Sequence, residues 1–288
     1  NPGDEVIIPA PYWVSYPDIV LLAEGKPVIV TCEEKQGFKI TPSQLEKNIT
    51  SKTKWLMLNS PSNPTGAVYS KQELLELSEV LLKHPHVNIL TDDIYEKIIY
   101  DTNVFCTLAS VVPELKNRTL TLNGVSKAYC MTGWRLGYCG GPKEIIAGMN
   151  KIQSQSTTST SSISMAASVE ALNGNQDFID NHNIQFIKRR NMVVQKLNDI
   201  DGISCSVPAG AFYVYPSCAG IMGKKTLDGN IINSDEKFMN YLLESEGVAG
   251  VHGEAFGLSP YFRLSYATSE KILEDACNRI ARACNNLK

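Results

Sequence analysis

Short apolar, strand-like runs alternate with amphipathic segments from Glu5 to Leu122. Crossover helices between parallel strands produce this alternation, and such helices cover the faces of the sheet. Two helix starts carry local signals: Ser70-Lys71-Gln72-Glu73 is a capping-box sequence ahead of leucines at helical spacing, and Thr41-Pro42-Ser43-Gln44 places proline at a first helical position. The sequence therefore predicts an α/β fold built on a mainly parallel sheet.

A Ser/Thr-rich stretch, residues 154–162, has the composition of a flexible linker. The stretch that follows, residues 164–172, is a small-residue helical segment suited to close packing against a sheet, so we do not place a domain boundary at the linker-like stretch. We place the boundary later, within the helix-like segment 177–200.

The last third of the chain has its own strand-like runs, residues 211–215 and 261–266, and ends in a helical segment. This pattern indicates a smaller α/β domain at the C-terminus. The predicted division is a large domain of residues 1–185 and a small domain of residues 186–288.

The composition argues against several classes of protein. Of the 288 residues 43% are hydrophobic, which is ample for a buried core, and the formal net charge is -3. A chain without a basic excess has no broad electropositive surface, so we expect neither nucleic-acid binding nor binding to anionic membranes. No apolar run approaches the ~20 residues of a membrane-spanning helix, and the first residues carry no targeting signal, so a cytoplasmic location is expected.

The eight cysteines are scattered and form no Cys-x-x-Cys pair, which favours reduced thiols in a cytosolic core. His84 and His86 are separated by a proline, and no third ligand of suitable type lies near them in the sequence. No metal site is predicted.

Asn63, Asp92 and Lys127 each follow an apolar, strand-like run of the predicted sheet. In a doubly wound sheet, ligands bind beyond the carboxyl ends of the strands, so we expect these three side chains to converge on one crevice. Arg263 lies inside a strand-like run of the predicted small domain.

Lys127 lies in a turn-like segment with Arg135 eight residues further on. A lysine becomes a nucleophile toward carbonyl groups when it is desolvated or placed beside other cations, and an arginine also binds anionic groups of a cofactor. This spacing suggests pyridoxal phosphate. A Ser-Lys pair is weak evidence by itself, because most lysines are solvated surface groups.

Other side chains suit a pyridine-type cofactor, although each has an ordinary alternative. The carboxylate of Asp92 would keep a ring nitrogen protonated, or else cap a helix that begins near Ile94. Tyr95 and Asn63 would hydrogen-bond to a ring hydroxyl, but asparagine is also common before proline in a turn. Trp13 offers an indole to stack on the ring, or it is a core aromatic residue.

Together these motifs resemble the pyridoxal-phosphate-dependent aminotransferases of fold type I, class I, and the resemblance covers the whole chain. The motifs that carry it are Asn63-Pro64-Thr65-Gly66, Asp92-x-x-Tyr95, Ser126-Lys127-x₇-Arg135 and Arg263-Leu264-Ser265-Tyr266-Ala267. The runs Pro11–Pro17 and Met131–Arg135 look most like the bacterial aspartate aminotransferases, in the subgroup that includes prephenate-accepting members. The fold expected from this resemblance is a large cofactor-binding domain with a smaller C-terminal domain.

The resemblance implies roles for the residues around the cofactor. Lys127 binds pyridoxal phosphate covalently, Asp92 pairs with the ring nitrogen, and Tyr95 acts with Asn63 on the ring oxygen. Trp13 stacks on the ring. Lys127, Asp92 and Tyr95 are the expected catalytic residues.

The anion-binding roles implied by the resemblance fall largely to other residues. Ser126 and Arg135 bind the cofactor phosphate, and Arg263 binds the α-carboxylate of the substrate beside Asn63 and Trp13. The expected reaction moves an amino group from an L-amino acid, with aspartate as the first candidate, to a 2-oxo acid such as 2-oxoglutarate. A homodimer whose subunits complete each other's sites is implied as well.

Members of that family have a further N-terminal stretch, whereas this chain opens without methionine in a turn-like Asn1-Pro2-Gly3-Asp4. We therefore expect an N-terminally truncated chain that lacks part of the phosphate site, and the residue that recognises a second substrate carboxylate would lie in the absent segment or come from the partner subunit. The alternatives are an aromatic or prephenate aminotransferase, a pyridoxal-phosphate lyase on the same scaffold, or an inactive truncated chain. A nicotinamide-dependent dehydrogenase is poorly supported, because no Gly-x-Gly-x-x-Gly opens a helix after a strand.

Overall fold

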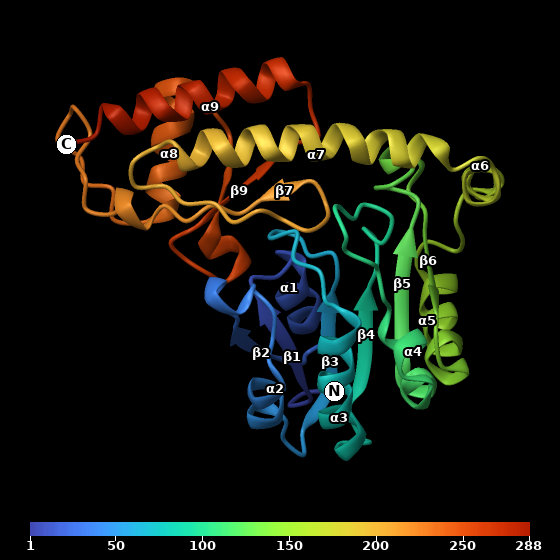
Figure 1. Ribbon diagram of the computed structural model, residues 1–288. Coiled ribbons are helices and arrows are strands. Elements are labelled where there is room, and N and C mark those ends of the chain that lie inside the picture. Colours follow the sequence, from blue (N-terminus) through green and yellow to red (C-terminus); the bar gives the residue numbers. More distant parts are fainter.

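The computed structural model describes residues 1–288 and confirms the predicted α/β architecture, with two sheets (Figure 1). The larger sheet consists of β1 (Glu5–Ala10), β2 (Lys26–Thr31), β3 (Thr53–Asn59), β4 (Asn88–Asp92), β5 (Thr119–Gly124) and β6 (Gly137–Gly140). The smaller sheet consists of β7 (Tyr213–Val214), β8 (Val251–His252) and β9 (Phe262–Ser265). The helices are α1 (Ser15–Leu22), α2 (Pro42–Asn48), α3 (Lys71–Lys83), α4 (Leu108–Val111), α5 (Lys143–Gln155), α6 (Ser162–Asn173), α7 (Asp177–Asn198), α8 (Asp235–Glu246) and α9 (Glu270–Asn285). Short 3-10 helices lie at Glu34–Gln36, Pro113–Arg118, Thr132–Trp134, Ala219–Ile221 and Gly253–Phe256.

The larger sheet has the strand order β2-β1-β3-β4-β5-β6. Its first five strands pair in parallel, and β6 runs antiparallel to β5. The chain passes from β1 to β2 on one side and then returns to place β3 on the other side of β1. Such a reversal of strand order opens a crevice at the carboxyl ends of the strands, which is the usual ligand site of this kind of sheet.

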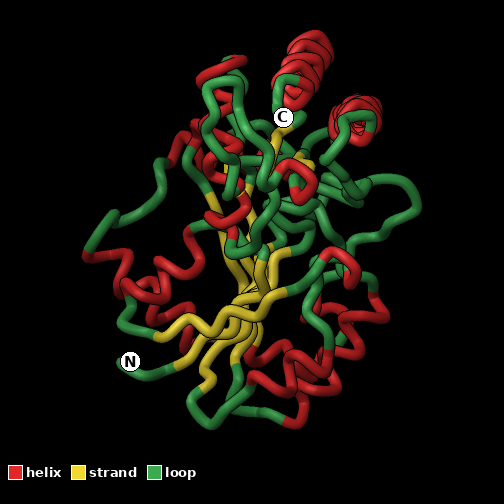
Figure 2. Tube along the Cα trace, turned by 90° about the vertical axis from the view of Figure 1, so that its left-hand side faces the viewer, coloured by secondary structure: helices red, strands yellow, loops and turns green.

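Alternate residues of β1 pack on opposite faces of the sheet, as the period of two along a strand requires. Ile7 lies in a cluster of 17 buried residues with Leu77 of α3. Ile8 packs on the other face against Tyr16 and Val20 of α1. Figure 2 shows the twisted sheet in the centre with helices on both sides of it.

Both predicted helix starts are confirmed. Thr41 and Ser70 each accept a hydrogen bond from the backbone of the third helical residue, and the side chain of that residue, Gln44 or Glu73, returns to the backbone of the cap. The linker-like Ser/Thr stretch connects α5 to α6 through residues 156–161.

Helix α7 runs across the upper part of the molecule, beneath α9 and above both sheets (Figure 1). A cluster of 31 buried residues joins α7 to the small sheet and to α8 and α9, and it also includes Tyr95, which follows β4. The core of the C-terminal part therefore reaches down to the loops of the large sheet. The domain boundary at residue 185 stays a prediction.

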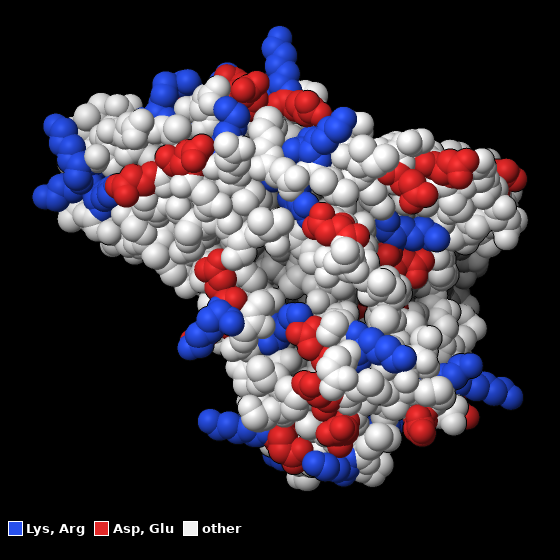
Figure 3. Space-filling view, in the orientation of Figure 1, with Lys and Arg blue, Asp and Glu red and all other residues white.

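On the face shown in Figure 3, Lys and Arg side chains lie interspersed with Asp and Glu, and no broad patch of one sign forms. No helix combines the length and the apolar character needed to cross a membrane.

Candidate active site

The carboxyl ends of four neighbouring strands, β1, β3, β4 and β5, bring their following residues together as predicted. Trp13, Asn63, Asp92, Tyr95 and Lys127 line one cavity of ≈ 240 Å³. A cavity of about 150 Å³ accommodates benzene in other proteins, so this one has room for a substituted six-membered ring. The remaining lining residues are Asn59, Ile94, Leu122 and Asn123.

Asp92 is the last residue of β4, where it lies between Asn59 of β3 and Leu122 of β5. The Tyr16 hydroxyl donates to Asp92 Oδ2 at 2.7 Å, and the Ile94 amide donates to Oδ1 at 3.3 Å. Burial raises the pKa of the Asp92 carboxyl, while these two hydrogen bonds and the nearby Lys127 ammonium oppose the rise. No helix begins here, so Asp92 closes a turn and is not a helix cap.

Lys127 is half-buried, with Nζ 5.6 Å from the centre of the Tyr95 ring. Burial lowers the pKa of this lysine, and the positive charges of Arg263 and Arg135 lower it further, whereas the Asp92 carboxylate raises it. A larger fraction of the amine is therefore neutral, and nucleophilic, than in a solvated lysine.

Arg263 extends from β9 of the small sheet to the loop that follows β3. Its Nη1 donates to Asn63 Oδ1 at 2.8 Å. The guanidinium carbon lies 4.6 Å from the ring centre of Tyr213 and 5.0 Å from that of Phe256. The contact fixes the Asn63 amide with its oxygen toward Arg263, which leaves its NH₂ group available to the cavity.

Two aromatic residues complete the walls. The Tyr95 hydroxyl is buried and lies 2.9 Å from the Tyr213 hydroxyl. Burial is the main cause that raises the pKa of Tyr95, and the Tyr213 hydroxyl raises it further. Trp13 is 38% exposed and packs edge-on against Tyr16 at 5.5 Å between ring centres. Trp13 is therefore not a core residue, because much of its indole remains exposed.

Ser126 and Arg135 lie outside the lining of this cavity. Arg135 is exposed, adopts a left-handed backbone conformation with φ 51°, and donates from Nη1 to the Thr132 carbonyl at 2.7 Å. Its charge nevertheless reaches Lys127, whose pKa it lowers.

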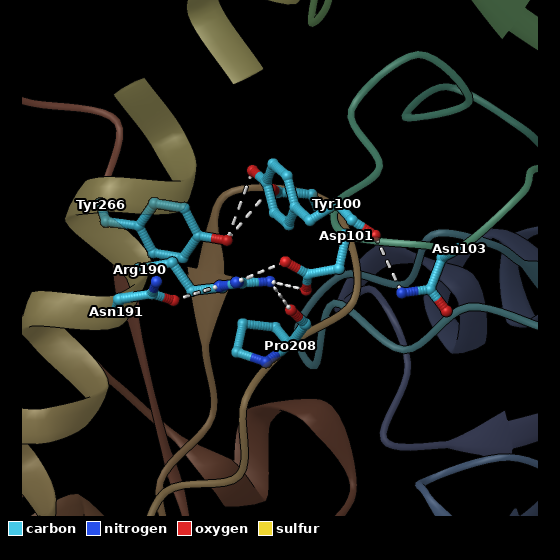
Figure 4. A network of polar contacts seen from close by, with 8 residues as sticks. Tyr100, Asp101, Asn103, Arg190, Asn191, Pro208 and Tyr266 are labelled. Atoms are coloured by element: carbon cyan, nitrogen blue, oxygen red, sulfur yellow. Dashed lines mark hydrogen bonds and ion pairs between the residues drawn. The ribbon is translucent and has the colours of Figure 1, made fainter. Parts of the chain in front are cut away.

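The loop after Tyr95 is anchored to α7 by Arg190 (Figure 4). Arg190 donates to both carboxylate oxygens of Asp101, at 2.7 and 3.1 Å, and to the Pro208 carbonyl at 3.1 Å. Its guanidinium also lies over the Tyr100 ring. This bidentate pair holds the carboxyl-end loop of β4 against the long helix.

Sequence reasoning missed four residues that hold the site together: Tyr16, Asn59, Tyr213 and Phe256. Asn59 Nδ2 donates to the backbone carbonyl of Asp92 at 2.8 Å, and Asn59 Oδ1 accepts from the backbone N–H of Asn63 at 2.8 Å. The only signals in the sequence were the position of Tyr16 next to the Trp13 run and of Asn59 in the Asn63 loop. Nothing local distinguished Tyr213 or Phe256 from core aromatics.

We predict that Tyr16→Phe destabilises the cofactor-free protein, and more at about pH 8 than at a pH below the pKa of the Asp92 carboxyl. The Tyr16 hydrogen bond favours the ionised carboxyl, so its loss raises the pKa of Asp92 further. The hydrogen bond contributes fully to the unfolding free energy at a pH above the Asp92 pKa of the variant. The contribution declines as the pH falls from that value to the Asp92 pKa of the unmutated protein. Hydrogen bonds to charged groups contribute about 1.5–3 kcal/mol, which is the expected loss in unfolding free energy at the higher pH.

The measurement is chemical denaturation at both pH values, with Tyr129→Phe as the matched control. The Tyr129 hydroxyl donates to the neutral Gln176 side chain at 2.9 Å, so the control loses a hydrogen bond without exposing a carboxylate to the change. Equal losses at the two pH values in Tyr16→Phe would contradict the prediction.

Comparisons with known proteins test the family resemblance that the sequence motifs indicate. A family model for aminotransferase class I and II matches residues 1–280. An aspartate aminotransferase of Rhizobium meliloti is 58% identical over 287 residues, which is 100% of this chain and 70% of the relative. An aspartate/prephenate aminotransferase of Cereibacter sphaeroides is 56% identical over 287 residues, which is 100% of this chain and 72% of that relative. The crystal structure of the aspartate aminotransferase from Rhizobium meliloti superposes with a TM-score of 0.98, covering 100% of this chain and 72% of that structure's chain at 58% identity. The resemblance read from the sequence is confirmed, and the chain belongs to the class I and II aminotransferase family.

Proposed function

We propose that this chain transfers the amino group of L-aspartate to a 2-oxo acid, 2-oxoglutarate in the first place, with pyridoxal phosphate bound to Lys127. The observation that carries the proposal is the convergence of Lys127 and Asp92 on one small cavity, with Arg263 hydrogen-bonded to Asn63 of the same lining. The second candidate acceptor is prephenate, because relatives about as similar to this chain are named aspartate/prephenate aminotransferases.

The donors and acceptors around the cavity suit pyridoxal phosphate. Asp92 accepts only two hydrogen bonds, so its carboxylate retains lone pairs for a protonated ring nitrogen. The Asn63 amide and the Tyr95 hydroxyl supply donors for a ring oxygen, and Trp13 offers an exposed indole face. When bound, the cofactor supplies a protonated pyridine ring that withdraws electrons from the substrate α-carbon.

The residues of the chain would supply binding and proton transfer. Lys127 Nζ, once free and neutral, accepts the proton that leaves the substrate α-carbon and later donates it, and its lowered pKa increases the fraction of amine that is free to accept that proton. Asp92 holds the proton on the ring nitrogen. Arg263 binds the α-carboxylate through N–H groups that its bond to Asn63 does not use, and this grip orients the α-hydrogen.

For the phosphate, we propose Ser126 and Arg135 at the rim of the cavity. The hydroxyl of Ser126 makes no hydrogen bond to another residue, and Arg135 uses one N–H for the Thr132 carbonyl. The guanidinium is exposed and keeps its other donors for an anion.

We further propose a homodimer that resides in the cytoplasm. None of the residues of α5 is buried, and large apolar side chains of α5 and α6 face solvent, among them Ile152 and Ile163 with exposed fractions of 74% and 73%. Exposed apolar surface on this scale is typical of a protein interface. The eight cysteines are all free, as expected in a reducing compartment.

The cofactor-binding lysine can be identified by borohydride reduction and peptide mapping. We expect the pyridoxyl label on Lys127, and Lys127→Ala should lose the label and lose turnover by about 10²–10⁴-fold, the usual contribution of a general base. Lys116→Ala, at an exposed lysine away from the cavity, is the control and should keep both. A label on any other lysine would refute the proposed function.

Arg263→Lys should raise the KM for aspartate and for 2-oxoglutarate alike, by about ten- to a hundredfold, because an ammonium cannot reproduce the planar two-bond contact with a carboxylate. The effect should be common to all α-carboxylate substrates. Arg279→Lys, on the surface of α9 in an ion pair with Asp275, is the control and should leave KM unchanged. A rise confined to dicarboxylic substrates would assign Arg263 to the side-chain carboxylate instead.

Sedimentation equilibrium should give twice the chain mass of 31.7 kDa. Ile152→Glu or Ile163→Glu should shift the equilibrium toward monomer, because a charge in an apolar interface is not solvated. Leu22→Glu, at a still more exposed apolar residue of α1, should have no effect. A monomer at every concentration would disprove the proposed dimer.

A further inference from the structure

Tyr213 contacts two groups of the proposed site that come from different sheets. Its hydroxyl lies 2.9 Å from the hydroxyl of Tyr95, which follows β4 of the large sheet. Its ring lies beneath the guanidinium of Arg263, at 4.6 Å, on the neighbouring strand β9 of the small sheet. Tyr213 is buried, with 7% of its surface exposed.

A strained turn holds Tyr213 in this place. Ala211, two residues earlier, has φ 57°, a left-handed conformation that costs a residue with a Cβ about 1–2 kcal/mol. The Ala211 amide donates to the Ile98 carbonyl at 2.9 Å, and its carbonyl accepts from the hydroxyls of Tyr100 and Tyr266. Backbone strain that the surroundings maintain in this way is typical of functional sites.

The turn at Ala211 is connected to the long helix α7 through Tyr100 and Arg190. The Tyr100 ring lies against the Arg190 guanidinium, whose hydrogen bonds to Asp101 and Pro208 are drawn in Figure 4. After the turn, Tyr213 pairs with Ser265 in the antiparallel ladder of β7 and β9. The position of Tyr213 is therefore fixed by both backbone and side-chain contacts.

The hydroxyl and the ring of Tyr213 would do different things. A phenol oxygen has one proton and two lone pairs, so Tyr95 can donate its proton into the cavity only if it accepts from Tyr213. A hydroxyl that accepts a hydrogen bond is also a stronger donor. The ring face attracts the Arg263 guanidinium, and Phe256 does so from a second ring at 5.0 Å.

We propose that Tyr213 is a positioning residue that acts on both halves of the site: its hydroxyl directs the Tyr95 proton toward the cofactor ring oxygen, and its ring holds Arg263 for the substrate carboxylate. The proposal rests on the proposed function, in which Tyr95 and Arg263 have these roles. It adds a residue that lies outside the lining of the cavity and acts through Tyr95 and Arg263.

Two substitutions separate the two effects. Tyr213→Phe removes the hydroxyl and keeps the ring, whereas Tyr213→Leu removes both. Tyr215→Phe is the matched control, since its buried hydroxyl donates only to backbone carbonyls, with the Leu258 oxygen at 2.8 Å.

The first readout is the pH midpoint of the absorbance change of the lysine-bound cofactor. Weaker donation from Tyr95 disfavours the unprotonated ring oxygen, so Tyr213→Phe should raise the midpoint by about half a unit to one unit, the equivalent of one neutral hydrogen bond. In a Tyr95→Phe background, Tyr213→Phe should add nothing, because the hydroxyl acts through Tyr95.

The second readout needs no cofactor: calorimetric titration of the cofactor-free protein with succinate. Tyr213→Leu should weaken binding by about three- to thirtyfold, as loss of a cation–π contact requires, while Tyr213→Phe and Tyr215→Phe should bind as the unchanged protein does.

An unchanged midpoint in Tyr213→Phe, or an equal shift in the Tyr95→Phe background, would overturn the role of the hydroxyl. Unchanged succinate affinity in Tyr213→Leu would overturn the role of the ring. If Tyr213→Leu does not fold, Tyr213→Phe and its double-mutant cycle still decide the first half. If the protein without substitutions takes up no cofactor, the proposed function is disproved. The succinate titration would still test the role of the Tyr213 ring.

Discussion

Parallel pairing of β1, β3, β4 and β5 is the constraint on which the site depends. Strands that run in one direction end at one edge of the sheet, so four loops that are distant in sequence begin side by side. Each strand end contributes at least one polar or aromatic group to the cavity, among them Trp13, Asn63, Asp92 and Lys127. The sheet core fixes their spacing before any ligand is present, and catalytic groups need such fixed spacing.

Burial acts in opposite directions on the two charged groups of the cavity. It raises the pKa of Asp92 and lowers that of Lys127, and in both it is the largest cause. Each group partly restores the charge of the other, and Tyr16 with the Ile94 amide supports the carboxylate further. The protein therefore maintains two partly desolvated groups of opposite charge, and the donors to the carboxylate are already in place; a preorganised polar site of this kind has no reorganisation to perform during a reaction.

Short sequence motifs correctly predicted the structural features that depend only on residues close together in the chain. The capping boxes at Thr41 and Ser70 depend on side chains three residues apart, and both formed as expected. The convergence of Asp92 and Lys127 followed from the βα pattern. The contacts of Tyr16, Tyr213 and Arg190 join residues 76 or more positions apart, so no periodicity or motif encodes them. The strand-like run 211–215 shows the same limit: only Tyr213–Val214 pairs, because the left-handed Ala211 turn precedes it.

Arg263 is held without losing its charge. It takes part in none of the ion pairs of the structure, and its partners are the Asn63 amide and two aromatic faces. Aromatic faces attract a guanidinium but leave its positive charge available, whereas a carboxylate partner would cancel it. That charge is one cause of the lowered pKa of Lys127. A substrate carboxylate bound at Arg263 would neutralise it and raise the pKa of Lys127, which makes the amine a stronger base when substrate is present. By linkage, protonation of Lys127 would favour carboxylate binding by the same factor, so in the proposed function one guanidinium would couple substrate binding to proton transfer.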